Sequence, residues 1–449
     1  MQLSSLLKSV SGLLLVSGGG VFAQFILIKL LSEQVESNLV YVLASLEICA
    51  AMSVCISVVG GEFSFLNFFF KKDSLQERLN ILSGYLFLTL AVFFLICTPI
   101  LIFCVFLFWG GWEVLGVFLL YGMVSVFLLV VSLFFRAQSK FFLSGALEKL
   151  PVFVLLFFFV VCNFFAFGID FYNVVLLSSL ACLTLVCFLL AFLFFRSSYR
   201  GAVGRGEYIA ECINSTLPMF RDRSARKVSA TNVLVFLYER GDQVLIGLML
   251  GPVAMAAYYV CYKVSFFVRF FAKMVNRIFY TYISKKVNSS AGCEKEPVGV
   301  SRLIRFNLDA NSLVSFLFSL AVFVFSERIL GYLNINDGEY VLVLKVLALS
   351  LYLSSLNQVY FNYINASSSG DLYFSNAVQV TLAQFVLFFC LVPFFGVLGV
   401  ALAKLLSVLW GMVNSFRYMR RIGGPAVSGF LYPAFGVFLF LTFFVQWVI

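Results

Sequence analysis

Long apolar runs separated by short polar stretches make up nearly all of this chain of 449 residues. Each run has about the 20 apolar residues that a helix needs to cross a membrane. Six runs precede the longest polar stretch of the first half, and seven follow it. They cover residues 10–31, 37–60, 78–108, 112–135, 141–167 and 171–195, and then 228–250, 254–276, 303–326, 340–365, 373–393, 397–418 and 428–448. The pattern predicts an all-α polytopic membrane protein.

The polar stretch at residues 196–227 divides the first twelve runs into two sets of six. We therefore expect an N-terminal six-helix bundle at residues 1–195, a basic cytoplasmic linker at 196–227 and a C-terminal six-helix bundle at 228–418. Transporters built from two such halves carry their site between them, so a central cavity is expected. Residues 419–449 are expected to add a thirteenth transmembrane helix.

The composition excludes a soluble or disordered chain. Hydrophobic residues make up 62% and charged residues 12%, against about a quarter charged in a soluble domain. The net charge is +10. With the N-terminus in the cytoplasm, about 24 of the 31 Lys and Arg residues fall in cytoplasmic loops, as the positive-inside rule requires. The basic balance therefore predicts an orientation, and we expect no nucleic-acid partner.

Several kinds of chemistry are excluded by what the sequence lacks. There is no His, and the eleven Cys residues form no C-x-x-C pair, so we expect no metal site and no His-dependent catalysis. No Walker A sequence is present, and the glycines of the 196–227 stretch do not have the dinucleotide-binding order. The predicted outer loops are short and leave no room for the acceptor site of a membrane polymerase. We expect a transporter, with no catalytic residues and no cofactor.

Two stretches of the C-terminal half carry a family resemblance. The first starts at Gly241 and reads GDQVLIGLMLGP, followed from Ala256 by AAYYVCYK. The second, PFFGVLGVALAK, starts at Pro393. Both resemble motifs of the bacterial O-antigen flippases, which belong to a superfamily that also includes multidrug-and-toxin extruders and the lipid II flippase. The chain departs from that family in its thirteenth run and in having no Pro at Phe279–Tyr282.

The resemblance implies a flippase of the bacterial cytoplasmic (inner) membrane. Its substrate would be undecaprenyl diphosphate carrying an O-antigen or capsule repeat unit, moved from the inner to the outer leaflet by alternating access. Membrane lipids and the polysaccharide polymerase machinery would be its other partners. The alternative is a cation-coupled drug or metabolite antiporter of the same superfamily, for which an acidic cavity would be expected.

Charged residues inside predicted spans are costly and usually face a cavity or a partner. Arg240 and Lys263 lie near the middle of their spans, and we expect them to line the cavity and bind the diphosphate. A structural pair with a buried carboxylate is the alternative. Arg269, Lys273 and Arg277 recur at intervals of four residues on one helix face. They are expected either to draw in the diphosphate or to contact anionic lipid headgroups.

Three acidic residues, Glu47, Asp242 and Asp309, are candidates for coupling to H⁺ or Na⁺, with a structural role as the alternative. Amide and aromatic side chains of the tenth run are candidates for sugar contacts, with helix packing as the alternative; they are Asn357, Tyr360 and Asn362. Three lysines near the predicted outer ends of spans, Lys29, Lys345 and Lys404, are expected to extend toward the interface.

Overall fold

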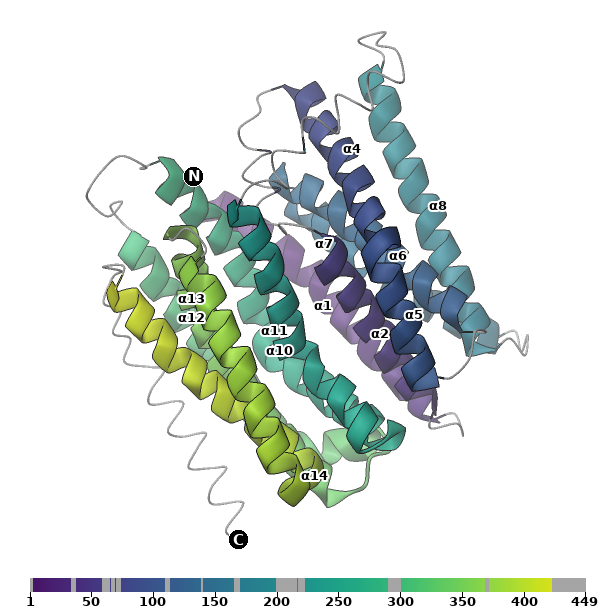
Figure 1. Cartoon of the computed structure of the whole chain (residues 1–449), viewed down its shortest axis with the longest axis vertical. Coiled ribbons are helices and arrows are strands. Elements are labelled where there is room, and N and C mark those ends of the chain that lie inside the picture. The colour runs from purple at the N-terminus through teal and green to yellow at the C-terminus, as the bar shows by residue number, and fades with distance from the viewer. Residues whose placement is uncertain are drawn as a thin grey trace. The chain divides into compact units, whose positions relative to one another are not determined.

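The computed structural model describes residues 3–33, 38–58, 65, 69, 74–109, 114–138, 140–164, 170–198, 216, 223–289, 300–367 and 371–421. Within these residues every regular element is helical and no strand occurs. Ten of the helices are long and apolar enough to cross a membrane. The predicted all-α polytopic membrane fold is confirmed (Figure 1).

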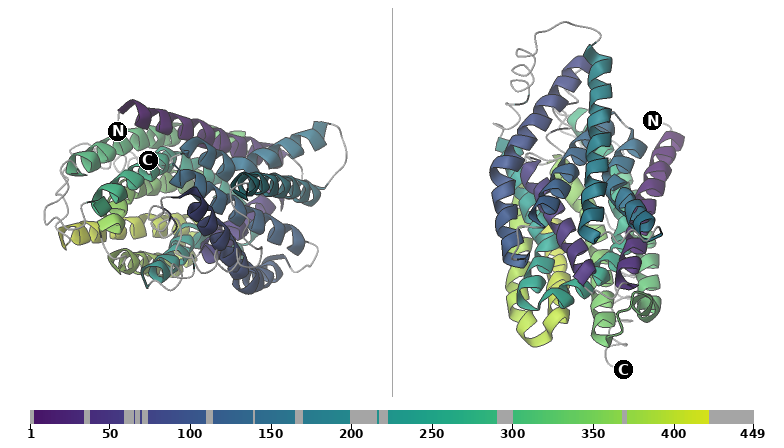
Figure 2. Two further views of the ribbon diagram at one scale, coloured as in Figure 1. Left: turned by 90° about the horizontal axis from the view of Figure 1, so that it is seen from above. Right: turned by 90° about the vertical axis from the view of Figure 1, so that its right-hand side faces the viewer.

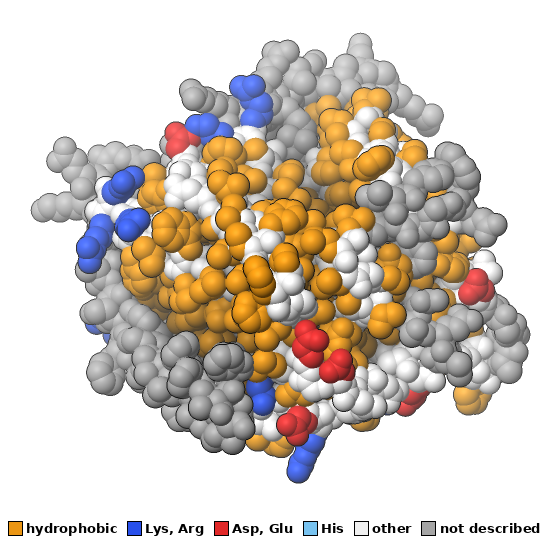
Figure 3. All heavy atoms as spheres, turned by 60° about the horizontal axis from the view of Figure 1, so that its bottom comes forward, with side chains coloured by type: hydrophobic (Ala, Val, Ile, Leu, Met, Phe, Trp, Pro, Cys, Tyr) orange, Lys and Arg blue, Asp and Glu red, His pale blue; other side chains and the backbone are white. Residues whose placement is uncertain are grey.

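Hydrophobic side chains cover most of the described surface on the face drawn in Figure 3. Large apolar residues such as Phe103, Phe157 and Phe188 expose 67%, 62% and 75% of their area. Exposed apolar area on this scale is unusual for a soluble monomer and is typical of a surface that faces lipid.

The chain divides into two compact units. The first unit contains residues Met1–Leu31 and Val42–Phe236. Its helices are α1 (Leu3–Glu33), α2 (Asn38–Ser57), α4 (Leu75–Val92), α5 (Thr98–Trp109), α6 (Leu115–Ala137), α7 (Phe141–Phe164) and α8 (Phe171–Ser198). A π-helical turn, η1 (Phe93–Cys97), joins α4 to α5, so that one predicted run forms one span. Helix α6 packs against α7 and α8.

Charges inside the first unit have partners on neighbouring helices. Arg136 of α6 forms an ion pair with Glu148 of α7, and Ser132 donates a hydrogen bond of 3.2 Å to the same carboxylate oxygen. Glu47 of α2 accepts a hydrogen bond from the amide of Gln24 on α1. These contacts tie α1 to α2 and α6 to α7.

The second unit contains residues Ser32–Tyr41 and Leu237–Ile449. Its helices are α10 (Arg223–Met249), which enters the unit at Leu237, α11 (Pro252–Ser289), α12 (Val300–Tyr332), α13 (Gly338–Ser367) and α14 (Asp371–Arg421). Helix α13 lies at the centre, because it packs against α11, α12 and α14 (Figures 1 and 2).

Helix α14 consists of two helices that meet at a sharp break. Gly396 has φ +52°, a conformation that glycine adopts without strain, and Pro393 lacks a backbone N–H for the helical ladder. Beyond the break, a Cβ atom at Gly399 would lie 2.6 Å from the carbonyl oxygen of Leu391, so glycine is needed for the close approach. The predicted runs at 373–393 and 397–418 are therefore two antiparallel helices of one hairpin.

Several helices extend further than their apolar runs, among them α10 and α11. Helix α10 begins at Arg223 rather than 228, and α11 continues to Ser289 rather than ending at 276. Hydropathy marks the part of a helix that lies in lipid, whereas Lys, Arg and Ser residues continue a helix into water at little cost. The charges of α10 also keep it outside the ten apolar helices of the described chain. The thirteenth run lies outside the described residues.

Candidate functional site

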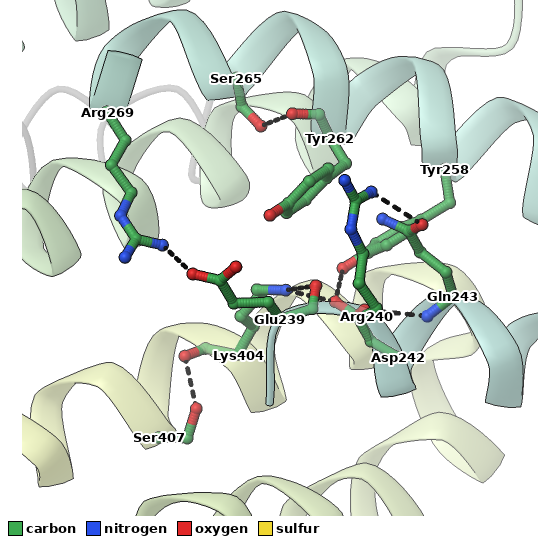
Figure 4. Close-up of polar contacts among 10 residues, drawn as sticks. All are labelled: Glu239, Arg240, Asp242, Gln243, Tyr258, Tyr262, Ser265, Arg269, Lys404 and Ser407. Atoms are coloured by element: carbon green, nitrogen blue, oxygen red, sulfur yellow. Dashed lines mark hydrogen bonds and ion pairs between the residues drawn. The ribbon is translucent and has the colours of Figure 1, made fainter. Parts of the chain in front are cut away.

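Five charged side chains of the second unit gather where α10, α11 and α14 meet (Figure 4). We call them the charged cluster; its members are Glu239, Arg240, Asp242, Arg269 and Lys404. Their spacing explains the convergence. On α10 the three members fall within about one turn. On α11, Tyr258, Tyr262 and Arg269 recur at intervals of four and seven residues, which places them on one helix face.

A buried ion pair lies at the centre of the charged cluster. Lys404 Nζ lies 2.6 Å from Asp242 Oδ2, and the two side chains expose 3% and 0% of their area. Tyr258 donates its hydroxyl proton to the same oxygen at 2.7 Å, and the backbone N–H of Gln243 donates to Oδ1 at 2.9 Å. Lys404 also donates to the backbone oxygen of Glu239 at 3.3 Å. The carboxylate is therefore desolvated but neutralised and hydrogen-bonded, as a buried charge must be.

A second ion pair joins α11 to α10. Arg269 Nη1 donates to Glu239 Oε1 at 2.8 Å. The side chains are 11% and 25% exposed, so this pair is more open than the Lys404 pair. Arg269 Nε is buried and has no hydrogen-bond partner among the described residues.

Two cations lie close to the ring of Tyr262. Arg240 Cζ lies 5.2 Å and Lys404 Nζ 4.7 Å from its centroid, both within the range of a cation–π interaction. Arg240 Nη1 also donates to Gln243 Oε1 at 3.3 Å, and Gln243 Nε2 is buried without a partner among the described residues. The aromatic ring thus holds the Arg240 guanidinium inside the cluster.

Two further cations lie on α11. Lys263 Nζ is 5.2 Å from the ring centroid of Tyr259, and Lys273 Nζ is 5.5 Å from that of Phe266. The charged cluster itself contains three cations, Arg240, Arg269 and Lys404, and two carboxylates, Glu239 and Asp242.

The fold can be compared with solved structures. A variant of the Vibrio cholerae MATE transporter VcmN aligns with TM-score 0.61 and 12% identity over 96% of this chain and 99% of that chain. An outward-facing multidrug resistance MATE family transporter of the MOP superfamily aligns with TM-score 0.58 and 14% identity over 93% and 96%. The lipid II flippase MurJ, in an inward closed conformation, aligns with TM-score 0.52 and 12% identity over 99% and 97%.

The chain has the fold of these transporters. The resemblance to their superfamily, first indicated by the two sequence motifs, therefore holds at the level of the fold. A scan against protein-family models gives no match, and neither does a search of curated proteins. Membership in the O-antigen flippases stays a prediction, because identities of 12–14% establish the fold alone.

The structure brings three of the predicted site residues together, since Arg240, Asp242 and Arg269 all belong to the charged cluster. The structure corrects the predicted position of the Lys404 side chain. The sequence predicts that it extends toward the membrane interface, but its side chain is buried and paired with Asp242. Distance from a helix end is a poor guide here, because position 404 faces α10 rather than lipid. The partner residues are 162 positions apart, so no local signal could have found the pair.

The remaining predicted residues lie elsewhere. Glu47 belongs to the first unit, and Asp309 is half-buried on α12, outside the charged cluster. On α13, Asn357 and Tyr360 are buried and Asn362 is half-buried. The ring of Tyr360 packs 5.0 Å from that of Phe416 within a hydrophobic core. The side chain of Arg277 lies outside the described residues.

Proposed function

We propose that this protein is a flippase for a lipid-linked saccharide whose head group is a diphosphate. The substrate class is undecaprenyl diphosphate carrying an oligosaccharide repeat unit, moved from the inner to the outer leaflet of the bacterial cytoplasmic membrane by alternating access. The observation that supports the proposal is the excess of cations over carboxylates around the charged cluster. A diphosphate cannot cross about 30 Å of hydrocarbon unless its charge is compensated.

The charged cluster, together with two lysines of α11 outside it, offers the two kinds of contact that a diphosphate needs. The guanidinium of Arg240 can form paired hydrogen bonds with phosphate oxygens, whereas Lys263 and Lys273 supply compact positive charges. The buried Lys404–Asp242 pair has a different role, because it fixes α14 against α10 beneath the Arg240 side chain. Coupling of Asp242, Glu47 or Asp309 to H⁺ or Na⁺ stays a prediction.

A second candidate function is a drug or metabolite antiporter. The observation in its favour is the higher TM-score with MATE transporters, 0.61 against 0.52 for the lipid II flippase. Such a transporter of cationic compounds would be expected to present acidic groups to its substrate. Both carboxylates of the charged cluster are engaged by cations of this chain, which favours the flippase.

Binding to the purified full chain in lipid nanodiscs tests the proposal. We expect undecaprenyl diphosphate to bind at least about tenfold more tightly than undecaprenol, since hydrogen bonds to charged groups contribute about 1.5–3 kcal/mol. Arg240→Gln should remove most of that preference, and Arg240→Lys should remove part of it, because lysine keeps the charge but loses the paired geometry.

Arg305→Gln is the matched control, because Arg305 is exposed on α12 and lies outside the cluster. Ethidium serves as the cationic competitor. Equal binding of undecaprenol and its diphosphate would refute the flippase proposal, and displacement of the diphosphate lipid by ethidium would favour the antiporter.

A further inference from the structure

Three buried amide side chains of the second unit form a line that is separate from the charged cluster. Asn357 lies on α13, and Asn376 and Gln384 lie on the first half of α14. Their residues are 7%, 1% and 4% exposed. Asn357 Oδ1, Asn376 Oδ1 and Gln384 Oε1 are each buried without a hydrogen-bond partner among the described residues. We call these three side chains the amide line.

The hairpin of α14 places the amide line in register with the charged cluster. Asn376 Nδ2 donates to Ser415 Oγ at 3.4 Å, and a Cβ atom at Gly411 would lie 3.1 Å from Val380 and 3.3 Å from Asn357 Nδ2. The same antiparallel register brings Gln384 opposite Ser407, one turn beyond Lys404. At 1.5 Å per residue, the line extends from about 5 Å to about 16 Å along α14 from Lys404.

Helix packing alone does not account for these three side chains. A neighbouring polar set on the same hairpin is internally paired: Asn414 donates to Gln379 at 2.9 Å, and Gln379 donates to the Tyr418 hydroxyl at 3.3 Å. The same two helices can therefore satisfy amides through each other. A buried polar atom left without a partner costs about 1–3 kcal/mol, so three in a line indicate groups that are satisfied by something else.

The chemistry of the line selects for hydroxyl groups. It contains no charged side chain, and its open atoms belong to amides, which offer acceptors and donors in the same plane. Rotating a terminal amide group by 180° exchanges its oxygen and nitrogen, but one polar atom is still left without a hydrogen-bond partner. A hydroxyl group satisfies either arrangement, because it both donates and accepts. Gly411 lets the second half of α14 pack closely against Val380 and Asn357, which holds Asn357 beside the hairpin.

We infer that the amide line binds hydroxyl groups of an uncharged saccharide, while the charged cluster holds the diphosphate to which that saccharide is attached. The inference rests on the proposed function and adds the part of the site that would recognise sugar. It assigns Asn376 and Gln384, which the sequence did not single out, and it separates Asn357 from Tyr360, whose ring belongs to the hydrophobic core.

The test compares three ligands on the full chain in nanodiscs: undecaprenyl diphosphate, and the same lipid carrying one N-acetylglucosamine or one galactose. We expect at least one sugar-bearing lipid to bind about tenfold more tightly than the bare lipid, the equivalent of about 1.4 kcal/mol. Gln384→Met and Asn357→Leu should reduce that gain to less than about twofold and leave binding of the bare lipid unchanged. Gln379→Met is the matched control, because Gln379 is an exposed amide of the same hairpin.

The outcomes separate the two proposals. If the wild type binds bare and sugar-bearing lipids equally, the amide line holds water or packs helices, and the inference is overturned while diphosphate recognition stands. If the wild type binds none of the three, the proposed function fails as well. If both variants lose bare-lipid binding together with the sugar gain, the amides are structural and the inference is again overturned.

Discussion

The buried pair of Lys404 and Asp242 allows a quantitative prediction. Lys404→Met keeps the length of the side chain and removes its charge, leaving the Asp242 carboxylate, 0% exposed, with hydrogen bonds but no cation in direct contact. Breaking one partner of a buried ion pair typically costs about 3–5 kcal/mol. Asp242→Asn in the same chain removes the stranded charge, so the double variant should recover most of the loss.

Thermal unfolding of the purified protein in detergent measures this loss. For a unit of this size, 1 kcal/mol shifts Tm by about 2–4 °C, so Lys404→Met should lower Tm by roughly 6–20 °C. Lys404→Arg should lower it less, since it keeps the charge but not the compact geometry. Lys345→Met is the control. Lys345 is also buried, at 9% exposure, but the described residues give it no acidic partner. The Tm of the Lys345→Met variant should therefore not fall.

Two results would refute the predicted role of the Lys404–Asp242 pair. If Lys404→Met lowers Tm by less than about 2 °C, Lys404 does not neutralise a buried Asp242 carboxylate. A double variant that loses the sum of the two single losses would contradict the coupling on which the argument depends.

Two further predictions concern the hairpin and the orientation. Gly399→Ala should destabilise the protein by about 1–3 kcal/mol, because its Cβ would lie 2.6 Å from the Leu391 oxygen. Gly331→Ala is the control and should be neutral or slightly stabilising, since no atom lies within 4 Å of the added Cβ. Similar Tm values for the two variants would argue against the close approach. In a Cys-less chain in intact cells, an impermeant thiol reagent should label Ser37→Cys and spare Ser198→Cys, and the reverse pattern would invert the predicted topology.

The positions of the helices follow closely from the sequence. Each of the twelve apolar runs up to residue 418 corresponds to a helix or to one half of α14. The runs and the helices agree because the length of an apolar run is a local property set by the thickness of the membrane. Pro393 and Gly396 mark the break in α14 for an equally local reason, since their own backbone chemistry ends one helix and starts the next.

The candidate site was predictable only in part. An Arg or Asp within an apolar run signals a partner or a cavity by its cost, and on this ground the sequence singled out Arg240, Asp242 and Arg269. The position of Lys404 was predicted wrongly, because the sequence does not say which helix face a side chain occupies relative to its neighbours. The sequence carries no signal for Asn376 and Gln384, two of the amides that we infer to contact sugar, because an amide within an apolar helix costs much less than a charge.

The sequence by itself determined that this chain is a helical membrane protein and where its helices begin and end, to within a few turns. Tertiary structure alone decided which side chains meet: Lys404 with Asp242 across 162 positions, Arg269 with Glu239, and Tyr262 with the cations of Arg240 and Lys404. The physical reason is that helices apolar on nearly every side can turn many faces toward one another at similar cost in lipid. Only the packing of α10, α11, α13 and α14 selects the faces that bring these polar groups together.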